Sequence, residues 1–386
     1  MTTALLPLAV WGASLLFAIY TVLLYPLLLH WAARRWGRPV HKAPVRKRVS
    51  LIMAVHNGAP WMRAKLASIL RLDYPRDLFE VLVVSDGSTD GTDDIAAEFA
   101  VEGVKLLRVA RGGKAAALNA GIAQAQGEIL VFTDVRQRLD PEALRNMVAC
   151  FADPSVGVVS GELILIETGP GESGAGAYWR YEKWIRKNLS RLDSLFGATG
   201  ACYAMRRELA APLPKGTLLD DVHLPLRAFF QGYRLIFEES ARVYDYPAPV
   251  RSEFRRKLRT LAGNYQLLAA FPELLGPRNR MWLHFASTKV ARLMMPWALL
   301  AMAISSFWLP QPWRAFSLGA QAAFYGTAIL DPLLPRGFPL KRVTSAVRLF
   351  VVLMAAALLA AAVSLAPPRT LWGPAEVMEP PERIVE

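Results

Sequence analysis

The sequence predicts an α/β domain with a mostly parallel sheet, flanked along the chain by apolar segments. From about Val49 to Pro247, short β-rich runs alternate with helical stretches, and this alternation is typical of βαβ units. Long apolar runs precede and follow this part, so we expect one N-terminal and about three C-terminal transmembrane helices. The predicted fold class is therefore an α/β domain anchored in a membrane.

The composition agrees with a soluble part joined to several membrane segments. Of 386 residues, 53% are hydrophobic and 20% are charged. The net charge of +13 alone would allow nucleic acid, anionic lipid or phosphorylated ligands as partners. Much of the basic charge lies beside apolar segments, where membrane orientation explains it better than DNA does, so no nucleic acid partner is expected. Cys150 and Cys202 are expected to be free thiols.

The first apolar run, Leu5–Leu29, is long enough for a spanning helix. A cleavable signal peptide is the alternative, but the run is long and no positive charge precedes it. The basic run from Arg34 to Arg48 follows, and the positive-inside rule therefore places the α/β part in the cytoplasm.

Three apolar runs near the C-terminal end are expected to span the membrane as well. They cover about Met294–Leu309, Phe316–Leu334 and Ala346–Ala366. Because Pro296 interrupts the first of these runs, a tilted, broken or re-entrant segment is an alternative to a straight spanning helix there. Four spans would place the basic residues between the last two runs inside and the acidic tail outside. The sequence thus predicts a multi-pass protein of a bacterial inner membrane with its α/β domain in the cytosol.

Strands and helices follow one another regularly in the middle part. Buried strands are predicted at "VSLIMAV", "FEVLVVS", "VKLLRVA" and "EILVFTD", because each is a short apolar run bounded by turn residues. Two of the intervening helices have start signals: Thr92 is an expected N-cap, and Asp140 followed by Pro141 opens the helix after the fourth strand.

Polar residues gather where three of these strands end. "HNGA" follows the first strand, "SDGSTDGT" the second and "TDVRQ" the fourth. Ligands of open α/β sheets bind beyond the carboxyl ends of the strands, so we expect one site and not three separate loops. Asp86 stands among glycines that let backbone approach a ligand, and Lys114 begins a helix whose free N–H groups can meet a diphosphate. Neither segment is a Walker A loop or a GxGxxG fingerprint.

Taken together, these segments resemble glycosyltransferase family 2, in the membrane-embedded branch that includes cellulose, chitin and hyaluronan synthases. The similar segments are "AVHNGA", "VVSDGSTDGT", "GGKAAALNAGI", "ILVFTD", "GATGACYAMRRE" and "LLDDVHLPLRAFFQGYRLIFEE". They cover roughly Val49 to Asp245 in the family's order and spacing. The resemblance implies a GT-A fold, a nucleotide-sugar donor and inversion at the anomeric carbon.

On the donor side, the resemblance implies that Asn57, Asp86 and Lys114 hold the nucleotide and its diphosphate. Asp134 corresponds to the first carboxylate of the family's DxD metal motif, so the implied cofactor is a divalent metal, Mg²⁺ or Mn²⁺. Arg136 stands where the second carboxylate is expected. It could lie near the diphosphate or point to solvent, and we expect metal dependence to be weaker than with paired aspartates.

On the acceptor side, the segment with Gly200, Ala201 and Cys202 is implied to pack near the incoming sugar. "LDDVHL" is similar to the family's TED segment, which makes Asp221 the implied catalytic base and places Asp220 at the acceptor. An inverting displacement needs a carboxylate on the side of attack, because the acceptor hydroxyl must lose its proton. The leaving diphosphate accumulates charge and needs cations beside it.

The segment after the α/β part departs from the polymer-forming members. Their QxxRW motif aligns with Arg256, Arg259 and Thr260. Arg259 stays a candidate diphosphate ligand, whereas the missing tryptophan puts processive synthesis of a long polymer in doubt. An apolar stripe over Phe254–Phe271 predicts an interfacial amphipathic helix, and a second amphipathic helix is expected at about Tyr178–Leu195.

The predicted division of the chain is 1–33 (transmembrane helix), 34–48 (basic cytosolic linker), 49–250 (GT-A domain), 251–290 (interface helices), 291–368 (transmembrane helices) and 369–386 (acidic tail). We expect a membrane-bound inverting glycosyltransferase that moves a sugar, with a UDP-sugar as the first candidate donor, to a growing polysaccharide or lipid-linked acceptor. The alternative is a catalytically degenerate nucleotide-sugar-binding subunit of a synthase complex. The sugar, the linkage, the acceptor and the oligomeric state stay open.

Overall fold

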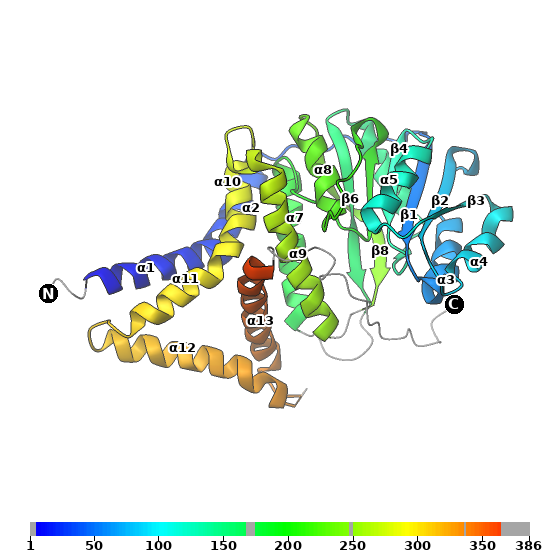
Figure 1. Cartoon of the computed structure of the whole chain (residues 1–386). Helices are drawn as coiled ribbons and strands as arrows, with labels where there is room; N and C mark the ends of the chain where they lie inside the picture. The colour runs from blue at the N-terminus through cyan, green and yellow to red at the C-terminus, as the bar shows by residue number, and fades with distance from the viewer. Residues whose placement is uncertain (1–4, 167–173, 247–249, 336, 364–386) are drawn as a thin grey trace. The chain divides into compact units, whose positions relative to one another are not determined.

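The computed structural model describes residues 5–166, 174–246, 250–335 and 337–363 (Figure 1). These residues form two compact units. The unit called the sheet unit contains residues 37–166 and 189–246, and the unit called the apolar unit contains residues 5–36, 174–188, 250–335 and 337–363. The predicted acidic tail lies outside the described residues.

Within the described residues, the sheet unit is built on one eight-stranded sheet. Its strands are β1 (Val49–Val55), β2 (Phe79–Asp86), β3 (Val104–Val109), β4 (Ile129–Thr133), β5 (Arg138–Leu139), β6 (Val156–Leu165), β7 (Cys202–Arg206) and β8 (Arg234–Asp245). Their order is β3-β2-β1-β4-β7-β6-β8-β5. The four predicted strands are β1 to β4, and they pair in parallel as the βαβ alternation indicated.

The sheet is mostly parallel, as predicted, but it is mixed, because three of its seven strand pairings are antiparallel. β7 pairs antiparallel with both β4 and β6, and β5 pairs antiparallel with β8, whereas β6 and β8 are parallel. β7 has the sequence "CYAMR", which lies inside the segment that resembles the family's acceptor motif. Its first four residues are buried, as a strand between two neighbours requires.

Helices cover both faces of this sheet. On one face, α3 (Ala59–Leu70), α4 (Thr92–Glu98) and α6 (Ala143–Ala149) share a core cluster with alternate strand residues such as Leu51 and Met53. On the other face lies α5 (Lys114–Gln124), whose Gly121 lies directly against Ile52 and Val84. Figure 1 shows α5 and α8 (Asp220–Phe230) in front of the sheet.

The two predicted N-caps are displaced, by one residue in α4 and by two residues in α6. Thr92 is the first residue of α4, after Gly91 in the left-handed region (φ 85°), and its N–H donates to Asp90 Oδ1 at 3.1 Å. α6 begins at Ala143, while Asp140 accepts from the N–H of Glu142 at 3.0 Å in the preceding turn. Asp90 and Asp140 therefore each stabilise a turn that leads into a helix. Neither Thr92 nor Asp140 is the N-cap residue.

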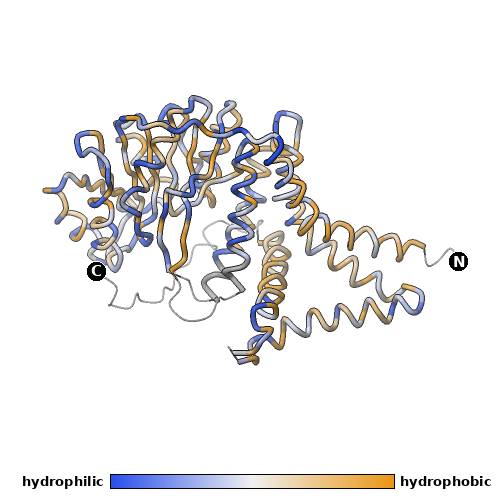
Figure 2. The backbone as a smooth tube through the Cα atoms, turned by 180° about the vertical axis from the view of Figure 1, so that it is seen from behind, coloured by the Kyte–Doolittle hydropathy of each residue, from blue (hydrophilic) through white to orange (hydrophobic). Residues whose placement is uncertain are grey.

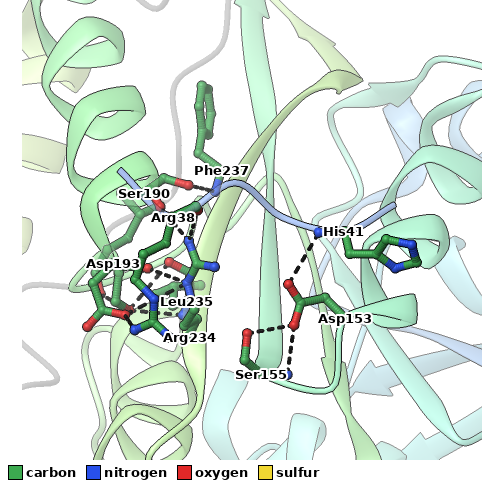
Figure 3. Close-up of polar contacts among 11 residues, drawn as sticks. Arg38, His41, Asp153, Ser155, Ser190, Asp193, Arg234, Leu235 and Phe237 are labelled. Carbon is green, nitrogen blue, oxygen red and sulfur yellow. Dashed lines mark hydrogen bonds and ion pairs between the residues drawn. The ribbon is translucent and has the colours of Figure 1, made fainter. Parts of the chain in front are cut away.

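The basic segment predicted as a linker is fixed along the sheet unit by specific contacts (Figure 3). The Arg38 N–H donates to the Arg191 carbonyl at 2.7 Å, and the His41 N–H donates to Asp153 Oδ2 at 3.3 Å. The buried Arg234 guanidinium donates to the carbonyl oxygens of Arg38 (2.8 Å), Ser190 (3.1 Å) and Asp193 (2.9 Å). One arginine of β8 thus ties the segment to the end of helix α7 (Gly174–Leu192).

Replacing this arginine tests how far it stabilises the sheet unit. Arg234→Met is expected to lower the free energy of unfolding by about 3 kcal/mol, because three carbonyl groups, two of them in buried contacts, lose a charged donor. The measurement is thermal unfolding of the purified protein. Arg242→Met on the exposed side of the same strand is the matched control, and an equal shift for both variants would contradict the expectation.

The apolar unit consists of helices. They are α1 (Leu5–Ile19), α2 (Tyr25–Arg35), most of α7, α9 (Val250–Ala270), α10 (Trp282–Phe285), α11 (Ala291–Ser306), α12 (Trp313–Leu330) and α13 (Lys341–Val363). The two predicted amphipathic segments both lie in helices, α7 and α9. Hydrophobic residues follow one another along α1, α11, α12 and α13 (Figure 2).

Two helices in the described part of the chain are long and apolar enough to cross a membrane. They are Leu5–Arg35, where a π-helical turn joins α1 to α2, and Lys341–Val363. The other two predicted spans are helices α11 and α12, and neither meets the same criterion of length and composition. Of the three C-terminal spans expected, one is therefore a candidate. Pro296 does not break its helix, because α11 continues to Ser306.

Small polar side chains join these helices. The Trp11 indole N–H of α1 donates to Ser317 Oγ of α12 at 2.7 Å, and Ser317 Oγ lies 2.8 Å from Ser306 Oγ of α11. Gln321 Nε2 donates to Ser306 Oγ at 2.9 Å. These hydrogen bonds link α1, α11 and α12 within the apolar unit.

Candidate active site

The predicted site residues of the sheet unit lie at one edge of the sheet. Asn57 follows β1, Asp86 ends β2 and Asp134 follows β4. β1 is hydrogen-bonded to both β2 and β4 in parallel, so these three ends are neighbours. Lys114 is the first residue of α5, which follows β3. The topology thus gathers side chains that are far apart in the sequence.

Asp86 holds the turn that starts α5. Its carboxylate is 2% exposed, accepts from the N–H groups of Gly112 (2.7 Å) and Gly113 (3.0 and 3.1 Å), and forms an ion pair with Arg111. Gly113 has a φ of 89°, a value that side chains other than glycine rarely adopt. Asp86 therefore fixes the position from which Lys114 enters the site.

Asn57 joins two of the polar loops. Its φ of 53° lies in the left-handed region, which asparagine tolerates better than most residues do. Its N–H donates to Ser88 Oγ at 3.1 Å, and its Oδ1 accepts from the N–H of Thr89 at 2.9 Å. The side chain thus braces the "SDGST" loop and is itself exposed.

Lys114 is the centre of a charged cluster. Its Nζ lies 2.9 Å from Asp134 Oδ1 and 3.2 Å from Asp220 Oδ2, and a quarter of its side chain is exposed. Burial disfavours the charged ammonium, but the carboxylates of Asp134, Asp220 and Asp221 outweigh that effect and raise the pKa of Lys114. The cluster therefore presents a permanent cation between carboxylates from two elements.

Asp221 faces the same space from the start of α8. A side-chain carbon added at Gly200 would lie 3.2 Å from Asp221 Oδ2 and 3.7 Å from Asp134 Oδ2, so both carboxylates face this glycine. The Ala198 N–H donates to the Asp221 carbonyl at 2.8 Å, which ties the glycine segment to α8. A side chain at this position would crowd the Asp221 carboxylate, and glycine avoids this.

Residues 50–213 match the family model described as glycosyl transferase family 2. This part of the chain is a family 2 glycosyltransferase domain.

Several characterised and solved proteins are similar to this chain. The probable glycosyltransferase YdaM of Bacillus subtilis is 26% identical over 262 residues, which cover 61% of this chain and 59% of YdaM. The β-monoglucosyldiacylglycerol synthase of Nostoc is 27% identical over 239 residues, which cover 58% of this chain and 50% of the synthase. The chain thus spans half to three fifths of the length of these two relatives.

One solved structure is similar over nearly the whole chain. The mannosyltransferase PcManGT of Pyrobaculum calidifontis, in complex with GDP-Man and Mn²⁺, is 27% identical. The alignment covers 92% of this chain and 99% of PcManGT, with a TM-score of 0.72. The similarity supports the GT-A-like fold of the glycosyltransferase domain.

In the glycosyltransferase domain, the Arg136 side chain does not point to solvent. It forms an ion pair with Asp245 at the end of β8, and that carboxylate is 4% exposed. Gln137 Nε2 donates to the same oxygen at 3.1 Å. A buried carboxylate needs a partner of opposite charge, and this need explains the direction of the Arg136 side chain.

The three residues predicted to lie near the acceptor, Gly200, Ala201 and Cys202, have different surroundings in the glycosyltransferase domain. Gly200 lies beside the Asp134 and Asp221 carboxylates, and the Ala201 carbonyl accepts from Thr133 Oγ1 at 2.7 Å. Cys202 is the first residue of β7, with a side chain 1% exposed in the core, and burial raises the pKa of its thiol to about 12. The thiol is therefore part of the core packing. Arg259 lies on α9 in the apolar unit, where it is partly buried.

The metal implied for this family can be tested against the donors that are present. Among the described residues, no three His, Cys, Asp or Glu side chains form a metal-binding group. Asp134 has one oxygen beside Lys114 and the other directed toward Gly200. One carboxylate oxygen fits a Mg²⁺ or Mn²⁺ ion that takes its other ligands from donor phosphates and water.

Two residues of the domain were missed from the sequence. Tyr203 of β7 is fully buried and stacks on Phe132 with ring centroids 4.8 Å apart, and its hydroxyl has no hydrogen-bond partner among the described residues. Burial, with Asp220 and Asp221 adding to it, raises its pKa. Lys65 of α3 is also buried. The sequence does indicate the burial of Lys65, because Lys65 lies at helical spacing between the apolar residues of the buried face of α3.

Proposed function

We propose that the chain is a membrane-bound, inverting glycosyltransferase that transfers a sugar from a nucleotide-sugar to a glycan or lipid-linked acceptor. The observation that carries this proposal is the position of Lys114 between Asp134 and Asp220, with Asp221 and Asp134 both facing Gly200. The cluster lies in a family 2 domain at the edge of the sheet where such folds bind ligands.

In this mechanism Asp221 is the general base. It accepts the proton of the acceptor hydroxyl as that oxygen attacks the anomeric carbon from the side opposite the leaving nucleotide. The new glycosidic bond forms as the bond from the anomeric carbon to the diphosphate oxygen breaks, and the electron pair leaves with the diphosphate. The base and the leaving group lie on opposite faces of the sugar, and the configuration is therefore inverted.

Lys114 supplies positive charge on the leaving-group side. Its raised pKa keeps the ammonium charged while negative charge grows on the diphosphate. Asp134 would hold the divalent metal, which supplies further positive charge to the diphosphate when bound. Arg136 stays paired with Asp245 in this proposal and does not bind the donor.

The acceptor is proposed to be membrane-bound. Two helices of this chain are apolar and long enough to cross a bilayer, and relatives include a β-monoglucosyldiacylglycerol synthase. A poly-β-1,6-N-acetyl-D-glucosamine synthase of Staphylococcus epidermidis is 36% identical over 117 residues, which cover 29% of this chain. Thr260 stands where the polymer-forming members have tryptophan, so we favour transfer of a single sugar.

A donor panel tests the proposal. The purified protein is incubated with UDP-, GDP- and dTDP-sugars, with Mg²⁺ or Mn²⁺ and membrane lipid extract, and nucleotide release is measured. Turnover with one donor class is expected, and NMR of the product gives the anomeric configuration. Donor binding without any turnover would contradict the enzyme and favour the degenerate subunit.

The role of Asp134 has its own test. Asp134→Asn keeps the size of the side chain but removes its charge, so we expect the stimulation of nucleotide release by Mn²⁺ to fall by about 10-fold or more. The metal titration is run beside Asp94→Asn, an exposed residue of α4. Unchanged metal stimulation in Asp134→Asn would show that the metal is held elsewhere.

A further inference from the structure

Lys65 is a lysine in a place where the fold would normally have an apolar residue. It lies on the face of α3 that packs against the sheet, among Met62, Leu66 and Ile69, and 1% of it is exposed. Fully buried lysines are rare unless they are paired with a charge of opposite sign. Among the described residues, no carboxylate lies within ion-pair distance of its ammonium group.

The ammonium group instead bonds to two neutral oxygens at the end of β4. Lys65 Nζ donates to Thr133 Oγ1 at 2.6 Å and to the Gln137 carbonyl at 2.7 Å. Thr133 directly precedes Asp134, and Gln137 is the last residue of the turn that follows Asp134. The side chain therefore clamps both ends of the segment that carries Asp134.

A second link continues from Thr133 to the other side of the site. Its hydroxyl accepts from Lys65 and donates to the Ala201 carbonyl at 2.7 Å. Ala201 directly follows Gly200, the glycine that both Asp134 and Asp221 face. Lys65, Thr133 and Ala201 thus form a buried hydrogen-bonded row beneath the site.

Burying the Lys65 ammonium group costs desolvation free energy. Burial lowers the pKa of Lys65 to about 8, although the carboxylates of Asp134 and Asp245 act in the opposite direction. A methionine would fill the same space with less desolvation. Features that violate the rules of core packing are expected where function requires them.

We propose that Lys65 is a positioning residue that holds the Asp134 turn and the Gly200–Ala201 segment at the spacing needed for donor and metal binding. The proposal rests on the proposed function, since it assigns Asp134 to the donor side. Lys65 is too deeply buried to contact a substrate, and it acts through Thr133 and the Gln137 carbonyl.

The test separates positioning from stability. Mn²⁺ binding is followed by electron paramagnetic resonance in the presence of UDP or GDP, without any sugar transfer. Lys65→Met is expected to weaken Mn²⁺ binding about 10-fold, the size seen when residues supporting a metal ligand are lost. Arg63→Met, on the exposed side of the same helix, is the matched control and is expected to leave binding unchanged.

Thermal unfolding is measured on the same samples. The proposal expects Lys65→Met to unfold within a few degrees of the wild type, because the desolvation of a buried cation is removed together with its hydrogen bonds. If binding falls only in parallel with the unfolding temperature, or does not fall at all, the positioning role is wrong.

A double-mutant cycle provides a second reading that does not depend on Lys65→Met alone. Thr133→Val removes the hydroxyl that joins Lys65 to Ala201 and should also weaken Mn²⁺ binding. In the variant that carries both Lys65→Met and Thr133→Val, the loss of Mn²⁺ affinity should be smaller than the product of the two single losses, because both substitutions break the same row of hydrogen bonds. Fully multiplicative losses would overturn the proposal. If the wild type binds Mn²⁺ with nucleotide but releases no nucleotide from any donor, the proposed function fails and the Lys65 proposal stands.

Discussion

Asp221→Asn is expected to lower kcat by about 10²- to 10⁴-fold, which is the range that general bases contribute. The amide cannot accept the proton of the acceptor hydroxyl, whereas the size of the side chain and its place beside Gly200 are kept. The measurement is steady-state nucleotide release with the donor found in the panel. The KM for the donor should change little, because the side chain acts on the acceptor side.

The control for this variant is Asp94→Asn, an exposed aspartate in the first turn of α4. It should retain the wild-type kcat. Full turnover in Asp221→Asn would exclude Asp221 as the base, and Asp220 is then the next carboxylate to test. That residue is paired with Lys114 and buried, which makes it the less accessible of the two.

Lys114→Met should have the second large effect, on donor binding. The variant leaves the carboxylates of Asp134, Asp220 and Asp221 close together without their cation, and an incoming diphosphate would meet only negative charge. We expect the affinity for UDP or GDP to fall by about 30-fold or more, a few kcal/mol at one charged contact. Isothermal titration with each nucleotide measures it directly.

Lys105→Met is the matched control, since Lys105 pairs with Glu80 at the surface of the same unit. Equal nucleotide affinity in Lys114→Met and the wild type would contradict the assignment. The pKa of Lys114 is raised in the folded state above the ordinary value of 10.5. Its stabilising contribution is thus fully present below pH 10.5 and is lost only as the pH rises through the higher folded-state value.

The strands of the first half of the sheet could be predicted because each is a short apolar run between turn residues. β1 to β4 lie at the predicted places, and their parallel pairing follows from the intervening helices. The mixed second half could not be predicted in this way. β7 is five residues long, and its pairing with β4 depends on contacts about 70 residues apart that no local pattern records.

The same distinction holds for the site. The approach of Lys114 to Asp134 follows from the rule that ligands gather at the ends of parallel strands. The partner of Arg136 does not follow, because Asp245 lies 109 residues further along the chain and its burial is a property of the folded unit. The helical stripe of α3 placed Lys65 on the buried face, but only the structure shows what its ammonium group contacts.

The course of the chain through α7 bears on any attempt to prepare the catalytic part by itself. Most of this helix belongs to the apolar unit, although the strands before and after it, β6 and β7, belong to the sheet unit. Its Glu182 pairs with Arg292 at 2.7 Å, and the Tyr181 hydroxyl donates to the Val22 carbonyl at 2.8 Å. A fragment trimmed at both termini would keep α7 but lose these partners, so its solubility would depend on deleting or redesigning that internal helix.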